Sequence, residues 1–188
     1  MRRNVLRLPL LVLLACLCAG ASPAAGVWLD VPFVKQEKNR CGAASIAMVM
    51  QFWQRQQGQA ATSASDSSEI QRTLYSPDDR GIRASAMESY LTQRGFQAFA
   101  FSGTQADLQQ HLEKGRPLIV ALKPGSGGPL HYVVVVGLDP AQNLILVNDP
   151  ADRKLLKLES AAFEKEWKGT GHWMLLAVPQ SEDKSSAR

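Results

Sequence analysis

Residues 34–50, VKQEKNRCGAASIAMVM, pass from a polar segment into an apolar one, and Cys41 lies at the junction. The apolar part predicts a helix that begins at Cys41. A thiol at a helix N-terminus lies among unpaired backbone N–H groups and at the positive end of the helix dipole, and both favour the thiolate. Gln36, five residues before Cys41, carries an amide that can donate to the same point. We therefore predict that Cys41 is a nucleophile and Gln36 an oxyanion donor.

The segment that follows Cys41 has the spacing of a helix with a broad apolar face. Its large and small apolar residues recur at helical intervals, and no Gly or Pro interrupts it between Gly42 and Gln57. A stripe of this width is typical of a helix that is mostly buried. The apolar positions are Ala44, Ala47, Met48, Phe52 and Trp53. We expect a central helix that holds Cys41 rigidly at its first turn.

The first 25 residues have the pattern of a secretory signal peptide. Arg2, Arg3 and Arg7 form a short basic region, residues 8–17 form an apolar run, and small residues follow as far as Ala25. The run has only about half of the ~20 residues that a membrane-spanning helix needs. We expect a protein that is exported to the periplasm or cell envelope.

The basic character of the chain comes mainly from this leader. The whole sequence has 188 residues, with 21 basic and 17 acidic side chains, and removing the leader's three arginines leaves 18 against 17. A nearly neutral domain offers no electrostatic basis for binding nucleic acid. The remaining chain is of ordinary size for one domain, and 45% hydrophobic residues suffice for a core.

Cysteine usage isolates one thiol. Cys16 and Cys18 lie in the leader, so Cys41 is the single cysteine of the predicted folded domain and has no partner there for a disulfide. It is either buried and inert or kept for chemistry. Leu13-Leu14-Ala15-Cys16 also resembles a lipobox, in which Cys16 would be lipidated and attach the protein to a membrane. Ordinary cleavage near Ala21 or Ala25 is the alternative, and both interpretations stay open.

Periodicity and turn residues predict an α+β fold with a single domain over residues 27–179 and a disordered tail over residues 180–188. Helices are expected at 41–57, 66–74, 85–94 (from a Ser-x-x-Glu capping box to Gly95), 104–114 and 160–168. Strands are expected at 27–34, 96–101, 117–122, 131–138, 143–148, 155–158 and 172–178. The helical first half should pack the Cys41 helix on a C-terminal antiparallel sheet.

His131 is the best candidate for a base among the three histidines. His111 lies on the polar side of its predicted helix, and His172 begins the last strand. His131 stands between a Gly-rich loop and the most hydrophobic strand, where a rigid backbone can present a side chain to a site. If the next turn centres on Pro140-Ala141, His131 lies opposite residue 149 or 150. Asp149 could then accept the second ring N–H and fix the tautomer.

The resulting set is Cys41, His131 and Asp149, with Gln36 ahead of the nucleophile. Attack of a thiol on a carbonyl group needs a base, a group that orients the base, and donors for the oxyanion. One cysteine and no ligand pair at structural-zinc spacing make a metal site a poor alternative. We expect neither a metal nor another cofactor.

Three segments resemble the boxes of the papain-like bacteriocin-processing peptidases, family thirty-nine of the cysteine peptidases. They are residues 36–45 (QEKNRCGAAS) around the cysteine, 131–137 (HYVVVVG) around the histidine and 147–151 (VNDPA) around the aspartate. The resemblance implies a papain-like fold, catalytic Cys41, His131 and Asp149, and oxyanion assistance from Gln36. Members of that family form the N-terminal domain of many ABC exporters and cut leader peptides after a double glycine.

Two departures from the family pattern bear on the substrate. Exporter-linked members often have Asp before the cysteine, where this chain has Arg40, and here an export signal replaces the transporter sequence. The chain therefore looks like a stand-alone, exported relative that acts on a peptide or protein outside the cytoplasm, with a secretion system or transporter as a candidate partner. A papain-like amidase or peptidoglycan hydrolase of the NlpC type is one alternative. A non-catalytic, peptide-binding secretion accessory is the other.

Overall fold

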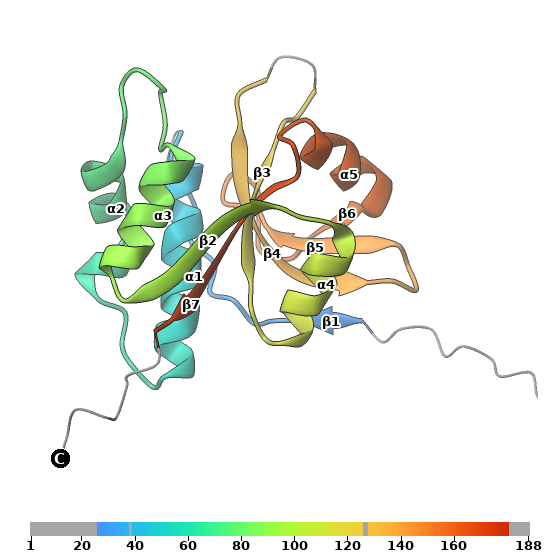
Figure 1. The fold of residues 1–188 in the computed structure, drawn as a ribbon, viewed down its shortest axis with the longest axis horizontal. Helices are drawn as coiled ribbons and strands as arrows, with labels where there is room; N and C mark the ends of the chain where they lie inside the picture. Colours follow the sequence, from blue (N-terminus) through green and yellow to red (C-terminus); the bar gives the residue numbers. More distant parts are fainter. Residues whose placement is uncertain (1–25, 38, 126–127, 181–188) are drawn as a thin grey trace, which may run out of the picture.

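The computed structural model describes residues 26–37, 39–125 and 128–180 (Figure 1). The predicted leader, and the predicted tail after Gln180, lie outside the described residues. The helices are α1 (Cys41–Gln56), α2 (Ser67–Leu74), α3 (Ala84–Gln93), α4 (Gln105–Glu113) and α5 (Ser160–Lys168), with a 3-10 turn η1 at Ser63–Ser65. The strands are β1 (Val27–Trp28), β2 (Phe96–Ser102), β3 (Leu118–Leu122), β4 (His131–Asp139), β5 (Leu144–Asn148), β6 (Leu156–Glu159) and β7 (Trp173–Pro179).

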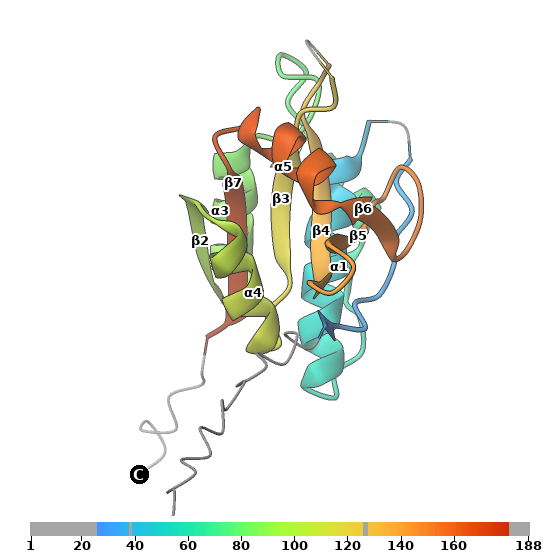
Figure 2. The ribbon, with the colours of Figure 1, turned by 90° about the vertical axis from the view of Figure 1, so that its right-hand side faces the viewer.

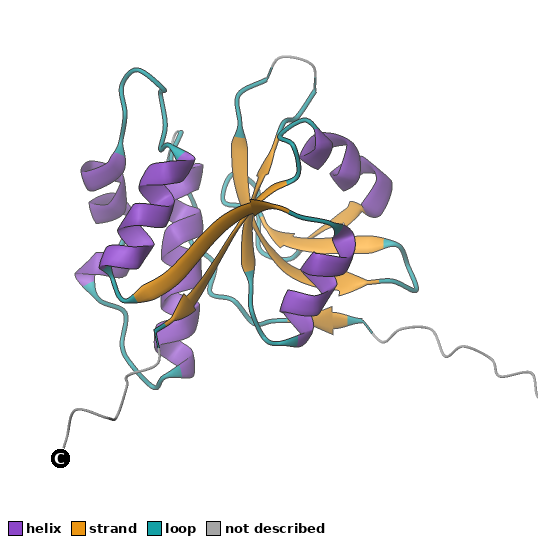
Figure 3. Cartoon of the chain, in the orientation of Figure 1, coloured by secondary structure: helices purple, strands orange, loops and turns teal. Residues whose placement is uncertain are grey.

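The strands form one antiparallel sheet in the order β2-β7-β3-β4-β5-β6, and β1 adds to β4. Helices cover both faces. Figures 1 and 3 show α1, α2 and α3 on one side and α4 and α5 on the other, and Figure 2 views the molecule from the α4 and α5 side. The predicted α+β architecture, with the sheet packed on the Cys41 helix, is confirmed.

The central strands are apolar at almost every position because both of their faces are buried. Along β4, Val134 and Val136 pack in the core with α1, while Val133 and Val135 pack in the core with α4 and α5. Alternate side chains of a strand point to opposite faces, so a sheet between two helical layers needs apolar residues on both. The second core includes Trp167 of α5, which is fully enclosed.

Side chains cap the first turns of α2 and α4 but not those of α1, α3 and α5. The Asp66 side chain accepts the backbone N–H groups of Ser68 and Glu69 at the start of α2, and Thr104 forms a capping box at the start of α4. The capping box predicted at the start of α3 is wrong. This helix begins at Ala84, so Ser85 lies inside it, and the N-cap is Arg83, which makes no side-chain cap hydrogen bond.

The predicted strand 27–34 is shorter in the structure. Only Val27 and Trp28 pair with β4, opposite Leu138 and Gly137. The chain then turns away, with the Val31 N–H donating to the carbonyl oxygen of Leu29, and runs across to the start of α1. The segment ahead of Cys41 therefore leaves the sheet after β1 and runs to the start of α1.

The predicted hairpin register is one residue off where it approaches the site. Val134, and not Val133, pairs with Asn148, and the ladder ends there without reaching His131. The turn centres on Ala141-Gln142, one residue later than predicted, so Asp139 pairs with Leu144. A bulge in β4 between Val135 and Gly137 then removes part of this offset. Gly137 lies against β1, where a Cβ atom would come within 2.6 Å of the Val27 carbonyl oxygen. Periodicity does not reveal a bulge of this kind.

No helix in the described part of the chain is both long enough and apolar enough to cross a bilayer.

Candidate active site

Cys41 is the first residue of α1 and is partly exposed. Unlike α2 and α4, this helix has no side-chain cap on its first N–H groups, so its positive end is open to a ligand. Gly42 lets the helix start lie close to its surroundings: a Cβ there would be 3.3 Å from Ile82 and 3.5 Å from the Tyr132 ring. Asn39 has a φ of 58°, which produces the sharp turn into the helix.

His131 is the first residue of β4, and its ring bridges two other candidate residues. Its Nε2 atom is 2.7 Å from Oδ1 of Asp149, and the ring lies close enough to the Cys41 thiol for each group to shift the pKa of the other. Because Nε2 faces the carboxylate, Nδ1 is the nitrogen available to the thiol. The side chains of His131 and Asp149 are only 19% and 16% exposed. The structure thus brings together the three residues that the sequence analysis selected.

Asp149 lies in a tight loop just after β5. Its Oδ1 also accepts the Ala151 N–H at 2.8 Å, its backbone N–H donates to the Arg153 carbonyl, and its own carbonyl accepts the Asp152 N–H. A carboxylate held by several hydrogen bonds presents one fixed orientation to the imidazole.

Asn148 anchors this loop, and the sequence analysis assigned it no role. Its side chain is fully buried, with Nδ2 donating to the Val31 carbonyl at 3.2 Å and Oδ1 accepting the Leu155 N–H at 3.0 Å. It therefore ties β5 to the segment before α1 and to the start of β6. The available signal was a polar side chain at the end of an apolar strand, where burial requires hydrogen-bond partners.

Gln36 borders the same cleft. Its backbone N–H donates to the Pro150 carbonyl at 2.9 Å, so the Asp149 loop also holds the predicted oxyanion donor. The side-chain Oε1 is buried without a partner among the described residues, whereas the Nε2 end is not enclosed. An amide with an open N–H end that lines the same cleft as the thiol has the chemistry of an oxyanion donor.

The electrostatics of the site favour a thiolate–imidazolium pair. Burial raises the pKa of the Cys41 thiol, but the hydrogen bond with His131, backbone hydrogen bonds from Tyr132 and Gly42, and the charge of the imidazolium together hold it below its ordinary value. Burial lowers the pKa of His131, but the opposite effect of Asp149 and the thiolate is larger and raises this pKa to about 9. Burial works against the Asp149 carboxylate, yet His131 and the loop N–H groups keep its pKa below the usual value.

Cys41, His131 and Asp149 all line a cleft of about 1180 Å³. One wall comes from the segment between α2 and α3, and the other from the loop between β3 and β4; both segments lie at the same end of the molecule (Figure 1). The described lining residues are Gln36, Asn39, Cys41, Gly42, Asp79–Ala84, Pro124, Gly128–Tyr132, Asp149 and Ala151.

The other two histidines lie away from this cleft. Nε2 of His172 is 2.7 Å from Glu164, and its ring packs edge-on against Trp167. His111 packs against Phe101. Among the residues that the structure describes, no cluster of His, Cys, Asp and Glu has the arrangement of a metal site.

Residues 28–174 match the Peptidase_C39 like family. The chain belongs to this family. This match confirms the family predicted from the sequence. A comparison with curated proteins found no match.

Solved structures of C39 peptidase domains have the same fold. A C39-like peptidase from Bacillus anthracis is 17% identical with a TM-score of 0.66, covering 84% of this chain and 99% of that one. The peptidase domain of Streptococcus ComA, a bifunctional ABC transporter of a quorum-sensing pathway, is 20% identical with a TM-score of 0.62 (80% and 98% covered). A double glycine motif protease from an AMS/PCAT transporter, in complex with the leader peptide, is 21% identical with a TM-score of 0.62 (82% and 95%). The papain-like peptidase fold is therefore confirmed.

Proposed function

We propose that this protein is a cysteine peptidase that hydrolyses peptide bonds with Cys41, His131 and Asp149. The main support is the imidazole of His131, which contacts the Asp149 carboxylate at 2.7 Å and interacts with the Cys41 thiol, with all three side chains lining one cleft. A family of peptidases and a pKa order that favours the ion pair point to the same chemistry.

The geometry supports a two-stage reaction. The Cys41 thiolate attacks the scissile carbonyl carbon, and the electron pair of the C=O bond moves to oxygen, which the Gln36 amide and the Cys41 backbone N–H stabilise. The imidazolium of His131 gives its proton to the leaving amine as the C–N bond breaks, and an acyl-enzyme remains. Neutral His131 then removes a proton from water, whose oxygen displaces the thiolate and releases the acid.

We place the substrate outside the cytoplasm and in the class of exported peptides, including those with a double-glycine or small-residue site. The predicted leader at residues 1–25 supports export, and the resemblance to a protease described as acting at double glycine motifs supports the peptide class. Attachment to a membrane through a lipid on Cys16 and action beside a secretion system or transporter belong to the same proposal.

The first experiment measures the reactivity of Cys41 with a thiol-directed peptide probe in the purified mature protein. We expect fast labelling that falls at least tenfold in His131→Ala, because the thiolate loses its ion-pair partner. His172→Ala is the matched control, since that histidine also contacts a carboxylate but lies away from the cleft. Equal labelling in the His131→Ala variant and the unmodified protein would favour the non-catalytic peptide binder.

Two further experiments address substrate and location. Synthetic double-glycine leader peptides should be cut after the second glycine, and no cleavage by an enzyme with proven thiol reactivity would remove that specificity. Peptidoglycan fragments are tested in parallel for the amidase alternative. For the lipid anchor, Cys16→Ser should release the protein from the membrane fraction, and continued membrane association would exclude a lipid on Cys16.

A further inference from the structure

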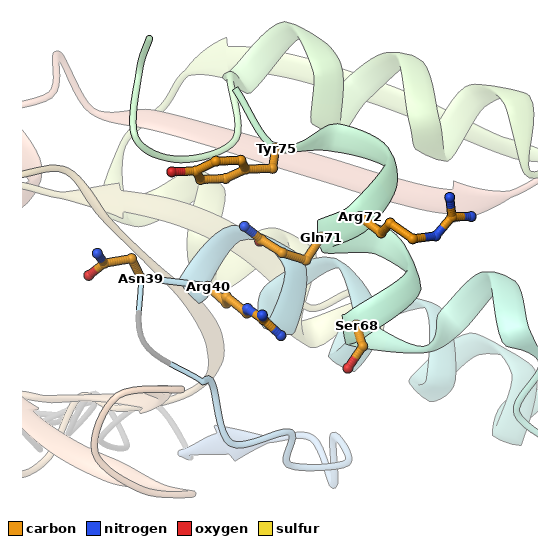
Figure 4. A pocket seen from close by; sticks show the side chains of 6 residues that line it. All are labelled: Asn39, Arg40, Ser68, Gln71, Arg72 and Tyr75. Carbon is orange, nitrogen blue, oxygen red and sulfur yellow. The ribbon is translucent and has the colours of Figure 1, made fainter. Parts of the chain in front are cut away.

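A second pocket, of about 530 Å³, lies beside the active-site cleft on the side of the α-helices (Figure 4). Its described lining consists of Asn39, Arg40, Ser68, Gln71, Arg72 and Tyr75. Asn39 lines this pocket and the cleft, so the two spaces meet two residues before Cys41. A group that occupies the pocket therefore lies close to a peptide bound at the thiol.

Gln71 is a polar side chain that the protein itself does not use. It is only 8% exposed, its Oε1 is enclosed without a partner, and no hydrogen bond joins its amide to the described residues. Its Nε2 end is not enclosed, and Figure 4 shows it pointing toward the space beside Asn39. The enclosed Oε1 atom has no donor among the described residues, whereas the N–H groups face the pocket. A group bound in the pocket that contacts this amide would therefore accept hydrogen bonds from it.

The rest of the lining also supplies donors. Arg40 pairs with Glu37, and Arg72 pairs with Glu69, but neither glutamate lines the pocket. A guanidinium has five N–H donors, so one carboxylate partner leaves others available. The Arg40 side chain is 37% exposed and that of Arg72 is 74% exposed, which makes Arg40 the inner of the two charges.

We propose that this pocket is a subsite that binds a carboxylate of the peptide substrate. Two cations, an amide N–H end and the Ser68 hydroxyl, with no acidic side chain among the described lining residues, match an anion that accepts several hydrogen bonds. The carboxylate belongs either to an acidic side chain near the scissile bond or to a free C-terminus. This inference rests on the proposed peptidase function, which it extends to substrate selection.

The test compares cleavage of fluorogenic peptides that differ only in Glu or Gln at one position on either side of the scissile bond. We expect kcat/KM to favour the Glu peptide by about tenfold at one position, which is the size of effect expected from a charged hydrogen bond that is partly exposed to solvent. Arg40→Gln and Gln71→Met should each reduce this ratio, Arg40→Gln to about one. Lys157→Gln on β6 makes the same charge change far from the pocket and should leave the ratio intact. Amidated and free-acid forms of each peptide separate the side chain from the C-terminus.

The subsite proposal is overturned if the wild-type protein cleaves the Glu and Gln peptides with equal kcat/KM at every position, whether the peptides are amidated or free acids. The peptidase function would remain in place. A preference that survives unchanged in Arg40→Gln and Gln71→Met would also overturn the subsite proposal. If the wild-type protein cleaves no peptide, the peptidase function fails separately. The subsite is then decided by fluorescence polarisation, where Cys41→Ala should bind labelled Glu peptides about tenfold more tightly than Gln peptides. Equal binding would refute it.

Discussion

Replacing Asp149 by asparagine removes a charge from the imidazole of His131 and keeps the shape of the side chain. The pKa of His131 is about 9, compared with 6.5 for an ordinary histidine, although burial alone would lower it. This difference corresponds to about 3 kcal/mol in favour of the imidazolium, shared between Asp149 and the Cys41 thiolate. Without the carboxylate we expect the His131 pKa to fall to its ordinary value or below.

The sign of the effect on activity follows from the raised pKa. An imidazolium with a pKa of about 9 persists at neutral pH and is lost as the pH rises through 9. In Asp149→Asn the same loss occurs at pH ~6.5 or below, so roughly 3% of the ring is charged at pH 8. We expect kcat/KM to fall about 30-fold at pH 8 from this cause, with a smaller loss at pH 6, and the alkaline limb of the pH–rate profile to shift down.

The assay is a pH profile of peptide cleavage combined with a pH profile of Cys41 alkylation by iodoacetamide. In Asp149→Asn the alkylation rate at pH 7 should also fall, because neutral His131 no longer lowers the thiol pKa. Asp152→Asn is the matched control: it removes a carboxylate from the same loop without contacting His131. An unchanged alkaline limb, or an equal proportional loss at pH 6 and pH 8, would refute the ion-pair reasoning.

Three other substitutions probe separate parts of the structure. Gln36→Ala should lower kcat by about 10²–10³ without slowing Cys41 alkylation, and equal effects on both rates would exclude a specific role in oxyanion binding. Asn148→Ala breaks two buried hydrogen bonds and should cost about 2–3 kcal/mol of unfolding free energy by urea titration, together with activity; an unchanged midpoint would contradict the anchoring role. Gly137→Ala places a Cβ 2.6 Å from the Val27 carbonyl oxygen and should detach β1, seen as faster hydrogen exchange of the Leu29 N–H, which donates to the Val136 carbonyl.

Most of the secondary structure was predictable because each element carries its own local signal. Helix α5 occupies the predicted residues, and α1 begins at the predicted Cys41. The second helical layer was not predicted, although the unbroken apolar run of β4 is typical of a strand with both faces buried. What covers each face depends on contacts between distant residues, which a local pattern does not specify.

The association of His131 with Asp149 was predicted through a register that the structure corrects. The two side chains meet because the chain turns sharply after Asn148 and hydrogen bonds orient Asp149, and not because the hairpin ladder pairs them. The turn centres one residue later than predicted, and a bulge beside Gly137 then changes the register by one residue without any local signal in the sequence. The pocket around Gln71 was not predictable either, because it arises from the packing of α2 against the segment before α1.

The Asp149 loop positions two groups that act at different atoms of the substrate. Its carboxylate orients the base, while its Pro150 carbonyl holds the backbone of Gln36, the proposed oxyanion donor. The Lys35 side chain adds a hydrogen bond to the Asp152 carbonyl, so consecutive residues of the Gln36 segment are tied to this one loop. The Asn148 side chain bonds to Val31, in the segment that leads to Gln36, and to Leu155, just after the Asp149 loop. A displacement of the Asp149 loop should therefore move the base and the oxyanion donor together. Substitutions at Asn148 should therefore impair proton transfer and oxyanion stabilisation jointly, whereas Gln36→Ala separates them.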